Sequence, residues 1–541
     1  MFLGYAGVAF LLLGLPLVLG SGRRYLGNGA DARLFIWSLA WWPHAILHAE
    51  NPFYSHAVWA PEGLNLAWTT SVPALALLFA PVTLVAGPVA AYNTASVLMP
   101  ALAAWSAFAL CRYLTRRLWP SVVGGFLFGF STFVLYEEKQ GHLNLDAVFV
   151  IPLVVLVLLR FLNGELGARG LILRLGPLLA LELLISTEVV FTLTFGVSVA
   201  LVLAFALARE RRGRLRALVL PLLGSYLLAA ALTAPFVYYL LTGFHRSAFW
   251  GRPQAGDLLN YVVPPDFALL AGSLGPRLAH GFSGMVLGEE VFVGLPALVI
   301  VALWAVRRTP ARPVLLTGLG ILLLAALGPH IHVYGSSVVP GPWTLVDHAP
   351  IFDNVLPDRL AIYLVLLAAV VVALWLARAG SSALAAVLAV LAVVSVLPDP
   401  VGQEWTTAYS APAFVTDGSY RGCLDPGEIV LPLPASYNTP LLWQALADFR
   451  FRIAAGTTAP TAPAAYGQPD AAYITAGHHL GAADAERVRR FVAAQHVTSA
   501  VVEGNESSFF NGALDRVATG QSAGGVVVYH FTSTPPSCLP A

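Results

Sequence analysis

The sequence predicts an all-α polytopic membrane domain over residues 1–397, followed by a small extracytoplasmic α/β domain over residues 398–541. Composition predicts the first domain, because 57% of the 541 residues are hydrophobic and only 11% are charged, whereas about a quarter of the residues in soluble domains are charged. A change from long to short apolar runs after Pro398-Asp399-Pro400 predicts the second. The formal net charge of +1 gives no reason to expect nucleic acid as a partner.

About eleven apolar runs have spanning or near-spanning length. The first lacks basic residues before it and a clear cleavage site, which favours a retained helix over a removed signal peptide. Another apolar stretch, 72–89, contains Pro73, Pro81 and Pro88, and each proline removes a backbone donor, so we expect a re-entrant or interfacial segment. The expected spans are 2–20, 94–111, 120–135, 147–162, 171–187, 189–208, 217–241, 289–306, 313–328, 359–378 and 383–397.

The arginines predict the orientation of these spans. Five short loops carry arginines, and two spans separate each loop from the next, so all five share one side, which the positive-inside rule makes cytoplasmic. The other loops and the C-terminal domain then face outward. Arg23 and Arg24 favour the opposite side for 21–71, and that loop is outward only if 72–89 does not cross. The outward segments are 28–70, 136–146, 242–288, 329–358 and 398–541.

A tryptophan-rich segment, residues 28–68, follows the first span and carries an acid, Asp31, near its start. Apolar residues recur at helical spacing from Asp31 to Asn51-Pro52, which predicts a helix lying along the outer face of the bilayer. Asp31 then has two interpretations. It is either a cap for the exposed amide groups of the helix or a carboxylate that takes part in chemistry.

A second polar cluster, "YEEKQGHLNLD" at 136–146, lies between two spans on the outward side. It is either a solvated turn or part of a functional site. Among the weaker candidates, Glu188 is an acid in an apolar stretch, and intramembrane acids usually face protein or a cavity. Arg359 suits a bidentate phosphate contact, although a salt bridge to Asp358 explains it equally. Glu289 begins an expected span on the outer side.

The layout of the chain resembles the GT-C superfamily of polytopic glycosyltransferases: a first span, an outward loop with an acid near its start, short-looped spans and a terminal extracytoplasmic domain. The motifs "DARLFIWSLAWWPHA", "NPFYSHAVWAPEGLNL" and "GHLNLD" are similar to those of bacterial members. The resemblance implies a catalytic base at Asp31 and a further acid or base from the second outward loop, with Glu138, His142 and Asp146 as candidates. Because Asp31 is followed by Ala32 and Arg33 rather than by a second acid, a divalent cation (Mg or Mn) stays an open cofactor.

The resemblance also implies the substrates and the location. We expect transfer of a sugar, hexose or pentose, from a polyprenyl-phosphate donor to a glycan, lipid or protein acceptor at the outer face of the bacterial inner membrane. Lipid is the surrounding partner, and the tryptophans are either a plain interfacial belt or surfaces that stack on sugars. The alternatives are a transporter or lipid flippase with an accessory outer domain, and a membrane scaffold. The candidate substrate-binding residues are Arg33, Trp41, Trp42, Lys139, Glu188, Glu289 and Arg359.

Two of the three cysteines are expected to form a disulfide. Cys423 precedes the strand-like run "EIVLPLP" and Cys538 follows "GVVVYHF", so the two sulfurs come within reach if those strands pair or neighbour one another. The opposing possibility is that Cys538, three residues from the chain end, belongs to a frayed tail. An extracytoplasmic location supplies the oxidising conditions that this bond needs, whereas Cys111 lies on the reducing side.

Overall fold

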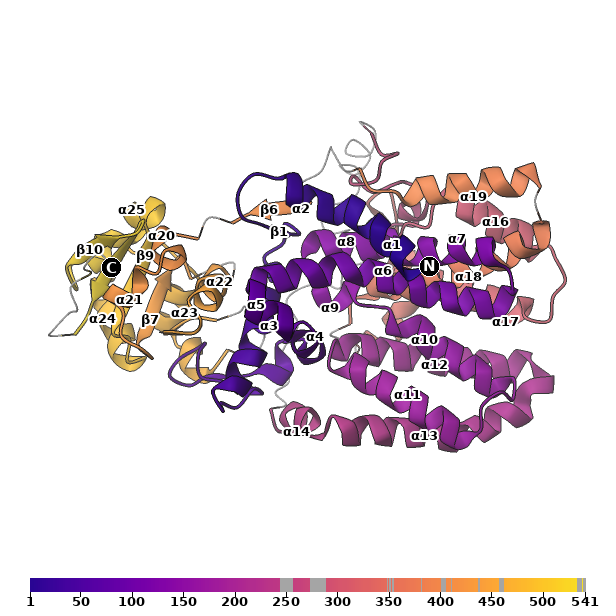
Figure 1. Ribbon diagram of the computed structural model, residues 1–541, viewed down its shortest axis with the longest axis horizontal. Helices are drawn as coiled ribbons and strands as arrows, with labels where there is room; N and C mark the ends of the chain where they lie inside the picture. The colour runs from indigo at the N-terminus through magenta and orange to yellow at the C-terminus, as the bar shows by residue number, and fades with distance from the viewer. Residues whose placement is uncertain are drawn as a thin grey trace.

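The computed structural model describes residues 1–243, 256–272, 289–347, 355–380, 382–399, 405–409, 411–435, 438–456 and 462–532, with Ala349, Phe352 and Cys538. Helices dominate the first 397 residues, and a sheet with short helices forms the C-terminal part, defined here as residues 405–538 (Figure 1). Much of the expected outward loop 242–288, and part of 329–358, lies outside the described residues.

Each of the eleven expected spans overlaps at least one helix, and seven described helices are long and apolar enough to cross a membrane. Three others, α16 (Leu295–Ala305), α17 (Arg312–Ala326) and α19 (Ala383–Val396), are shorter, so the total of eleven stays a prediction. The long helices are built from α1 (Phe2–Ala9) and α2 (Leu15–Leu19), α6 (Pro88–Thr115), α7 (Leu118–Gly129) and α8 (Thr132–Gln140), α9 (Leu143–Asp146) and α10 (Val150–Leu162), α12 (Thr187–Leu207), α13 (Arg212–Leu232), and α18 (Ala361–Ala379). Between them lie α11 (Ala168–Leu183) and α14 (Ala234–Thr242), and β4 (His330–Val333) pairs with β5 (Ser336–Pro340).

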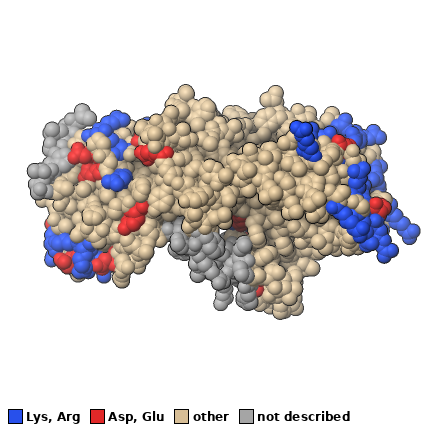
Figure 2. All heavy atoms as spheres, turned by 90° about the horizontal axis from the view of Figure 1, so that it is seen from below, with Lys and Arg blue, Asp and Glu red and all other residues tan. Residues whose placement is uncertain are grey.

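The charged side chains are segregated along the molecule. Figure 2 shows basic side chains, which are arginines, gathered at one end, charges of both signs over the C-terminal part at the other, and a nearly uncharged band between. An uncharged band between two charged ends is the surface expected of a chain that crosses a bilayer. The first 397 residues are therefore described here as a membrane domain.

The segment 72–89 does not form a membrane-crossing helix. It folds into α4 (Pro73–Leu78) and α5 (Ala80–Ala86), each far too short to span about 30 Å of hydrocarbon. Pro73 and Pro81 stand in the first turn of these helices, where a proline breaks no hydrogen bond. Leu78 and Val85 are 62% and 90% exposed, which suits a segment that contacts lipid.

A five-stranded mixed sheet organises the C-terminal part, with strand order β10-β11-β9-β7-β8. The strands β8, β7 and β9 are parallel, while β11 and β10 continue the sheet in antiparallel fashion. Cys423 and Cys538 are joined by a disulfide, although β9 separates the strands β7 and β11 that they flank. The elements of this part are α20 (Ala413–Thr416), α21 (Tyr420–Cys423), β7 (Ile429–Leu433), α22 (Thr439–Leu446), β8 (Arg452–Ile453), α23 (Pro469–Thr475), α24 (Ala485–Ala494), β9 (Ser499–Glu503), α25 (Ser507–Leu514), β10 (Gly520–Ala523) and β11 (Val526–His530).

Backbone pairing holds the C-terminal part against the loop that follows the first span. The strand β1 (Arg24–Leu26) pairs with β6 (Thr406–Ala408). The short strand β2 (Tyr54–Ser55) pairs with β3 (Leu64–Asn65). The segment between these two strands runs along the edge of the C-terminal sheet at β8. There the N–H of Trp59 donates to Ala455 O at 2.7 Å and the N–H of Ile453 to Ala57 O at 2.8 Å. These pairings fix the sheet relative to the membrane domain.

The helix α3 (Asp31–Leu47) lies between the C-terminal part and the other helices (Figure 1). It packs against α22, and the fully buried Gln444 links three segments there. Gln444 Oε1 accepts from Trp37 Nε1 at 2.7 Å, while its Nε2 donates to Ala57 O and Phe451 O at 2.7 and 2.9 Å. Because all of these bonds are buried, they hold α3 firmly against the sheet.

Candidate active site

Asp31 stands in the first turn of α3 but does not cap it. The N-cap position is Ala30, and no side chain caps this helix end. The Asp31 carboxylate is turned instead toward His142 of the membrane domain and Asn438 of the C-terminal part. Of the two interpretations, the structure therefore disfavours the cap and leaves a carboxylate that is 46% exposed.

Glycines let the start of α3 approach the turn that ends α8. Gly141 terminates α8 with φ +78°, a conformation that favours glycine, and a Cβ there would collide with Ala32. A Cβ on Gly29 would strike the backbone of Gln140 in the same way. The N–H of Asn28 donates to Lys139 O at 2.8 Å, which fixes the approach. Residues about 110 positions apart in the chain thus meet at Asp31 and His142.

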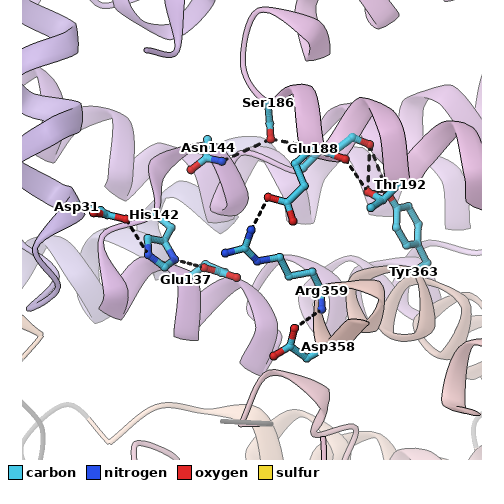
Figure 3. A network of polar contacts seen from close by, with 11 residues as sticks. Asp31, Glu137, His142, Asn144, Ser186, Glu188, Thr192, Asp358, Arg359 and Tyr363 are labelled. Carbon is cyan, nitrogen blue, oxygen red and sulfur yellow. Dashed lines mark hydrogen bonds and ion pairs between the residues drawn. The ribbon is translucent and has the colours of Figure 1, made fainter. Parts of the chain in front are cut away.

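His142 connects two carboxylates through its two ring nitrogens (Figure 3). Its Nε2 lies 3.3 Å from Asp31 Oδ2 and its Nδ1 lies 2.5 Å from Glu137 Oε2. The Glu137 side chain is 1% exposed, that of His142 24% and that of Asp31 46%. The three residues, named here the Asp31–His142–Glu137 chain, run from a buried acid to an accessible one.

The electrostatics of the site give Asp31 and His142 opposite charges. Burial lowers the pKa of His142, but the charge of Glu137 and the hydrogen bonds with Asp31 and Glu137 outweigh burial and raise it to about 9. The pKa of Asp31 lies below its usual range, chiefly through the hydrogen bond with His142, with the charges of His142 and Arg359 adding to it against the effect of burial. At neutral pH the site holds a deprotonated Asp31 beside a protonated His142.

Arg359 lies on the other side of this chain and is paired with Glu188 (Figure 3). Its guanidinium forms an ion pair with Glu188, whereas Asp358 accepts the backbone N–H of Arg359 at 2.9 Å. The charge of Arg359 also acts on Asp31 and His142, which places it at the same site. Two predicted substrate-binding residues, Glu188 and Arg359, are therefore brought together beside the Asp31–His142–Glu137 chain.

Glu138 and Asp146 form a separate buried group. Each is 1% exposed, so the segment 136–146 is not a solvated turn. The two carboxyl groups act on each other electrostatically, but neither oxygen of Glu138 has a hydrogen-bond partner among the residues that the structure describes. The candidates from this segment thus divide into His142, which contacts Asp31, and the buried pair Glu138 and Asp146, which act on each other.

The other predicted binding residues do not converge on Asp31 in this way. Arg33 Nη1 donates to Thr439 Oγ1 at 2.9 Å, and Lys139 Nζ pairs with Asp266 Oδ1 at 3.2 Å. The Trp41 and Trp42 side chains are buried at 1% and 3% exposure and donate to the backbone oxygens of residues 52 and 71. Neither ring offers a face to a ligand, so both tryptophans are left out of the site proposed below. Glu289 begins a short helical turn (Glu289–Val291), and its side chain lies outside the described residues.

The predicted set lacked two residues that contact this site. Glu137 is one of two adjacent glutamates in the sequence. Gly141 ends α8 and turns the chain back toward the last turn of that helix, and this reversal determines that Glu137 rather than its neighbour contacts the site. Asn438 Nδ2 lies 3.5 Å from Asp31 Oδ1 across 407 positions of sequence, and no local pattern indicates such a contact.

The described donor groups near Asp31 do not form a metal-binding set. Among the residues that the structure describes, no three His, Cys, Asp or Glu side chains are grouped so that they could hold a metal ion. The acids around Arg359 interact with the guanidinium rather than converging on a common point. We therefore derive no step through a metal.

Two solved structures resemble this chain over 98% of its length. The arabinofuranosyltransferase AftD from Mycobacteria has a TM-score of 0.55 and 14% identity, and the match covers 40% of AftD, so this chain spans two fifths of that protein. The archaeal oligosaccharyltransferase AglB from Archaeoglobus fulgidus, in complex with an inhibitory peptide and a dolichol-phosphate, has a TM-score of 0.50 and 14% identity, with 74% of AglB covered. Both are GT-C glycosyltransferases, so the expected GT-C fold is confirmed.

No curated protein matches the sequence. A family model described as "Domain of unknown function (DUF6311)" matches residues 2–397, well over half of the chain. The protein therefore belongs to the DUF6311 family.

Proposed function

We propose that the protein is an integral membrane glycosyltransferase that moves a sugar from a polyprenyl-phosphate donor to an extracytoplasmic acceptor, with Asp31 as the base. The observation that carries this proposal is the Asp31 carboxylate, accessible and deprotonated, held by His142 at 3.3 Å on a GT-C fold. The dolichol-phosphate bound to AglB supports a lipid phosphate as the donor.

In the proposed reaction an acceptor hydroxyl attacks the anomeric carbon of the donor sugar. The new carbon–oxygen bond forms while the bond to the lipid phosphate oxygen breaks, the electron pair leaves with the phosphate, and Asp31 takes the hydroxyl proton. The leaving phosphate gains negative charge, and Arg359 and protonated His142 are the cations that face it. A guanidinium has five N–H donors, so Arg359 can bind a phosphate beside Glu188.

The proposal is tested by reconstituting the full chain in lipid vesicles with a panel of polyprenyl-phosphate pentoses and hexoses. Release of the polyprenyl phosphate from at least one donor, dependent on a soluble glycan extract as acceptor, is the expected result. If no donor in a panel that covers the cellular donors releases its lipid phosphate, the proposal is wrong and a transporter is favoured.

Arg359→Gln is expected to raise the KM for the lipid donor about 10- to 100-fold, because a charged hydrogen bond to phosphate is lost. The measurement is release of lipid phosphate at varied donor concentration. Arg378→Gln is the matched control, since Arg378 lies in the last turn of α18, whereas Arg359 lies in the short turn Pro357–Leu360 just before the start of that helix. Equal KM values for the two variants would contradict a phosphate contact at Arg359.

We further propose that the site and the C-terminal part face outward from a bacterial inner membrane. Introduced thiols test the orientation, because Glu50 and Glu210 are both exposed and lie in loops predicted to be on opposite sides. In intact cells a membrane-impermeant maleimide is expected to label Glu50→Cys, and to label Glu210→Cys only after permeabilisation. The reverse pattern would invert the proposed orientation.

A further inference from the structure

The sheet of the C-terminal part has a switch point at the carboxyl ends of β7 and β9. The chain leaves β7 through α22 toward β8 on one side, and leaves β9 through α25 toward the β10–β11 side. Adjacent parallel strands whose connections diverge in this way form the position where open α/β sheets bind ligands. The carboxyl ends of these two strands are Leu433 and Glu503.

The carboxyl ends of β7 and β9 form one end of the sheet, named here the carboxyl edge and distinct from the lateral edge at β8. This edge lies beside the start of α3. Asn438, on the connection that follows β7, donates through Nδ2 to Ala30 O at 3.3 Å and lies 3.5 Å from Asp31 Oδ1. Thr439, the first residue of α22, accepts from Arg33. Glu503 lies near enough to Arg33 for their charges to interact. The switch point of the sheet and the proposed base therefore lie side by side.

Asn438 presents a buried oxygen without a donor. Both neighbours of its Nδ2 are acceptors, so the amide nitrogen faces them and Oδ1 points the other way. The residue is 4% exposed, and Oδ1 has no hydrogen-bond partner among the residues that the structure describes. A buried carbonyl oxygen that lacks a donor is unfavourable unless a ligand supplies one.

We propose that this edge is the acceptor site and that it binds a sugar, with Asn438 as a binding residue. One hydroxyl of the sugar donates to Asn438 Oδ1, and another hydroxyl donates to Asp31 and is the nucleophile. Asn438 Nδ2 lies 3.5 Å from Asp31 Oδ1, so a sugar bound at the Asn438 amide lies beside the proposed base. Arg33, Thr439 and Glu503 make the surroundings polar, which favours a hydroxylated acceptor over an apolar one. This inference rests on the proposed function, because it takes Asp31 as the base.

The test uses Asn438→Gly in the full chain. Asn438 has φ +57°, so glycine keeps the backbone conformation that alanine would strain, and removes only the side chain. The probe is a panel of methyl glycosides of the common pentoses and hexoses, with binding followed by saturation-transfer NMR on the protein in nanodiscs. We expect at least one glycoside to bind and Asn438→Gly to weaken it about tenfold. Asn511→Ala, in α25, is the control and should bind as the unaltered protein does.

Separate readouts distinguish this inference from the proposed function. The acceptor site is overturned if no glycoside binds, or if Asn438→Gly binds the glycoside as tightly as the unaltered protein does. Either result counts even if lipid phosphate is still released. Binding of a seryl or threonyl peptide with no glycoside bound assigns the edge to a protein acceptor and also overturns it. Glycoside binding that depends on Asn438, without release of lipid phosphate from any donor, supports the sugar site and removes the proposed transferase.

Discussion

Asp31→Asn is expected to lower the rate of sugar transfer about 10²- to 10⁴-fold, the usual contribution of a general base. The amide has the shape of the carboxylate but cannot take the hydroxyl proton. Its oxygen can still accept from one of the two donors that face Asp31, so the start of α3 should stay in place. Release of lipid phosphate under single-turnover conditions measures the chemical step, and thermal unfolding in detergent checks the fold.

Asp448→Asn is the matched control for this substitution. Asp448 also contacts α3, through His44 Nδ1 at 3.3 Å, but at the far end of the helix, and its side chain is 85% exposed. Asparagine tolerates the φ of +51° at this position. Transfer by Asp448→Asn should match that of the unaltered protein. Comparable losses in both variants would mean that the acids act through the stability of α3 rather than through chemistry.

Composition and proline placement were enough to predict most of the membrane domain. Apolar runs predict helices because bilayer-spanning segments must satisfy their own backbone hydrogen bonds, and every expected span overlaps at least one helix. The prolines of 72–89 predicted a segment that does not cross as one helix, and this segment forms the short helices α4 and α5. Asp31 stood out because few charges occur in this chain, so an acid in an aromatic segment needs an explanation.

The contacts around Asp31 were beyond sequence reasoning for two reasons. Trp41 and Trp42 look like interfacial anchors in the sequence, but both are buried. The helix α22, which follows strand β7 of the C-terminal sheet, packs on α3, Phe449 lies against Trp41, and Phe53 lies against Trp42. The edge of that sheet also brings Asn438 to Asp31, a contact created by the strand order rather than by any local pattern. Periodicity shows which residues share a face of one helix, and it does not show which distant element covers that face.

Glu137→Gln is expected to move the alkaline limit of transfer toward lower pH by about 1–3 units, the effect of removing one nearby opposite charge. His142 has a pKa raised to about 9, with the charge of Glu137 as the largest influence opposing burial. In the proposed reaction its imidazolium holds Asp31 and offsets the charge of the leaving phosphate, so activity should persist below that pKa and decline as the pH rises through it. Without the Glu137 charge, His142 loses its proton at lower pH, and the decline begins earlier. The remaining charged groups that act on His142 are Asp31, which supports the proton, and Arg359, which opposes it.

Glu138→Gln separates this electrostatic role from a structural one. Glu138 is the next residue of α8 and is also 1% exposed, but its charge acts on Asp146 and is not among the main influences on His142. Both substitutions replace a buried carboxyl group by an amide of the same shape, so both should affect stability alike. The pH–rate profile of each reconstituted variant is the measurement, and only Glu137→Gln should shift its alkaline limb. If the two profiles have the same alkaline limb, Glu137 does not set the protonation of His142, and the Asp31–His142–Glu137 chain is a packing arrangement rather than a part of the chemistry.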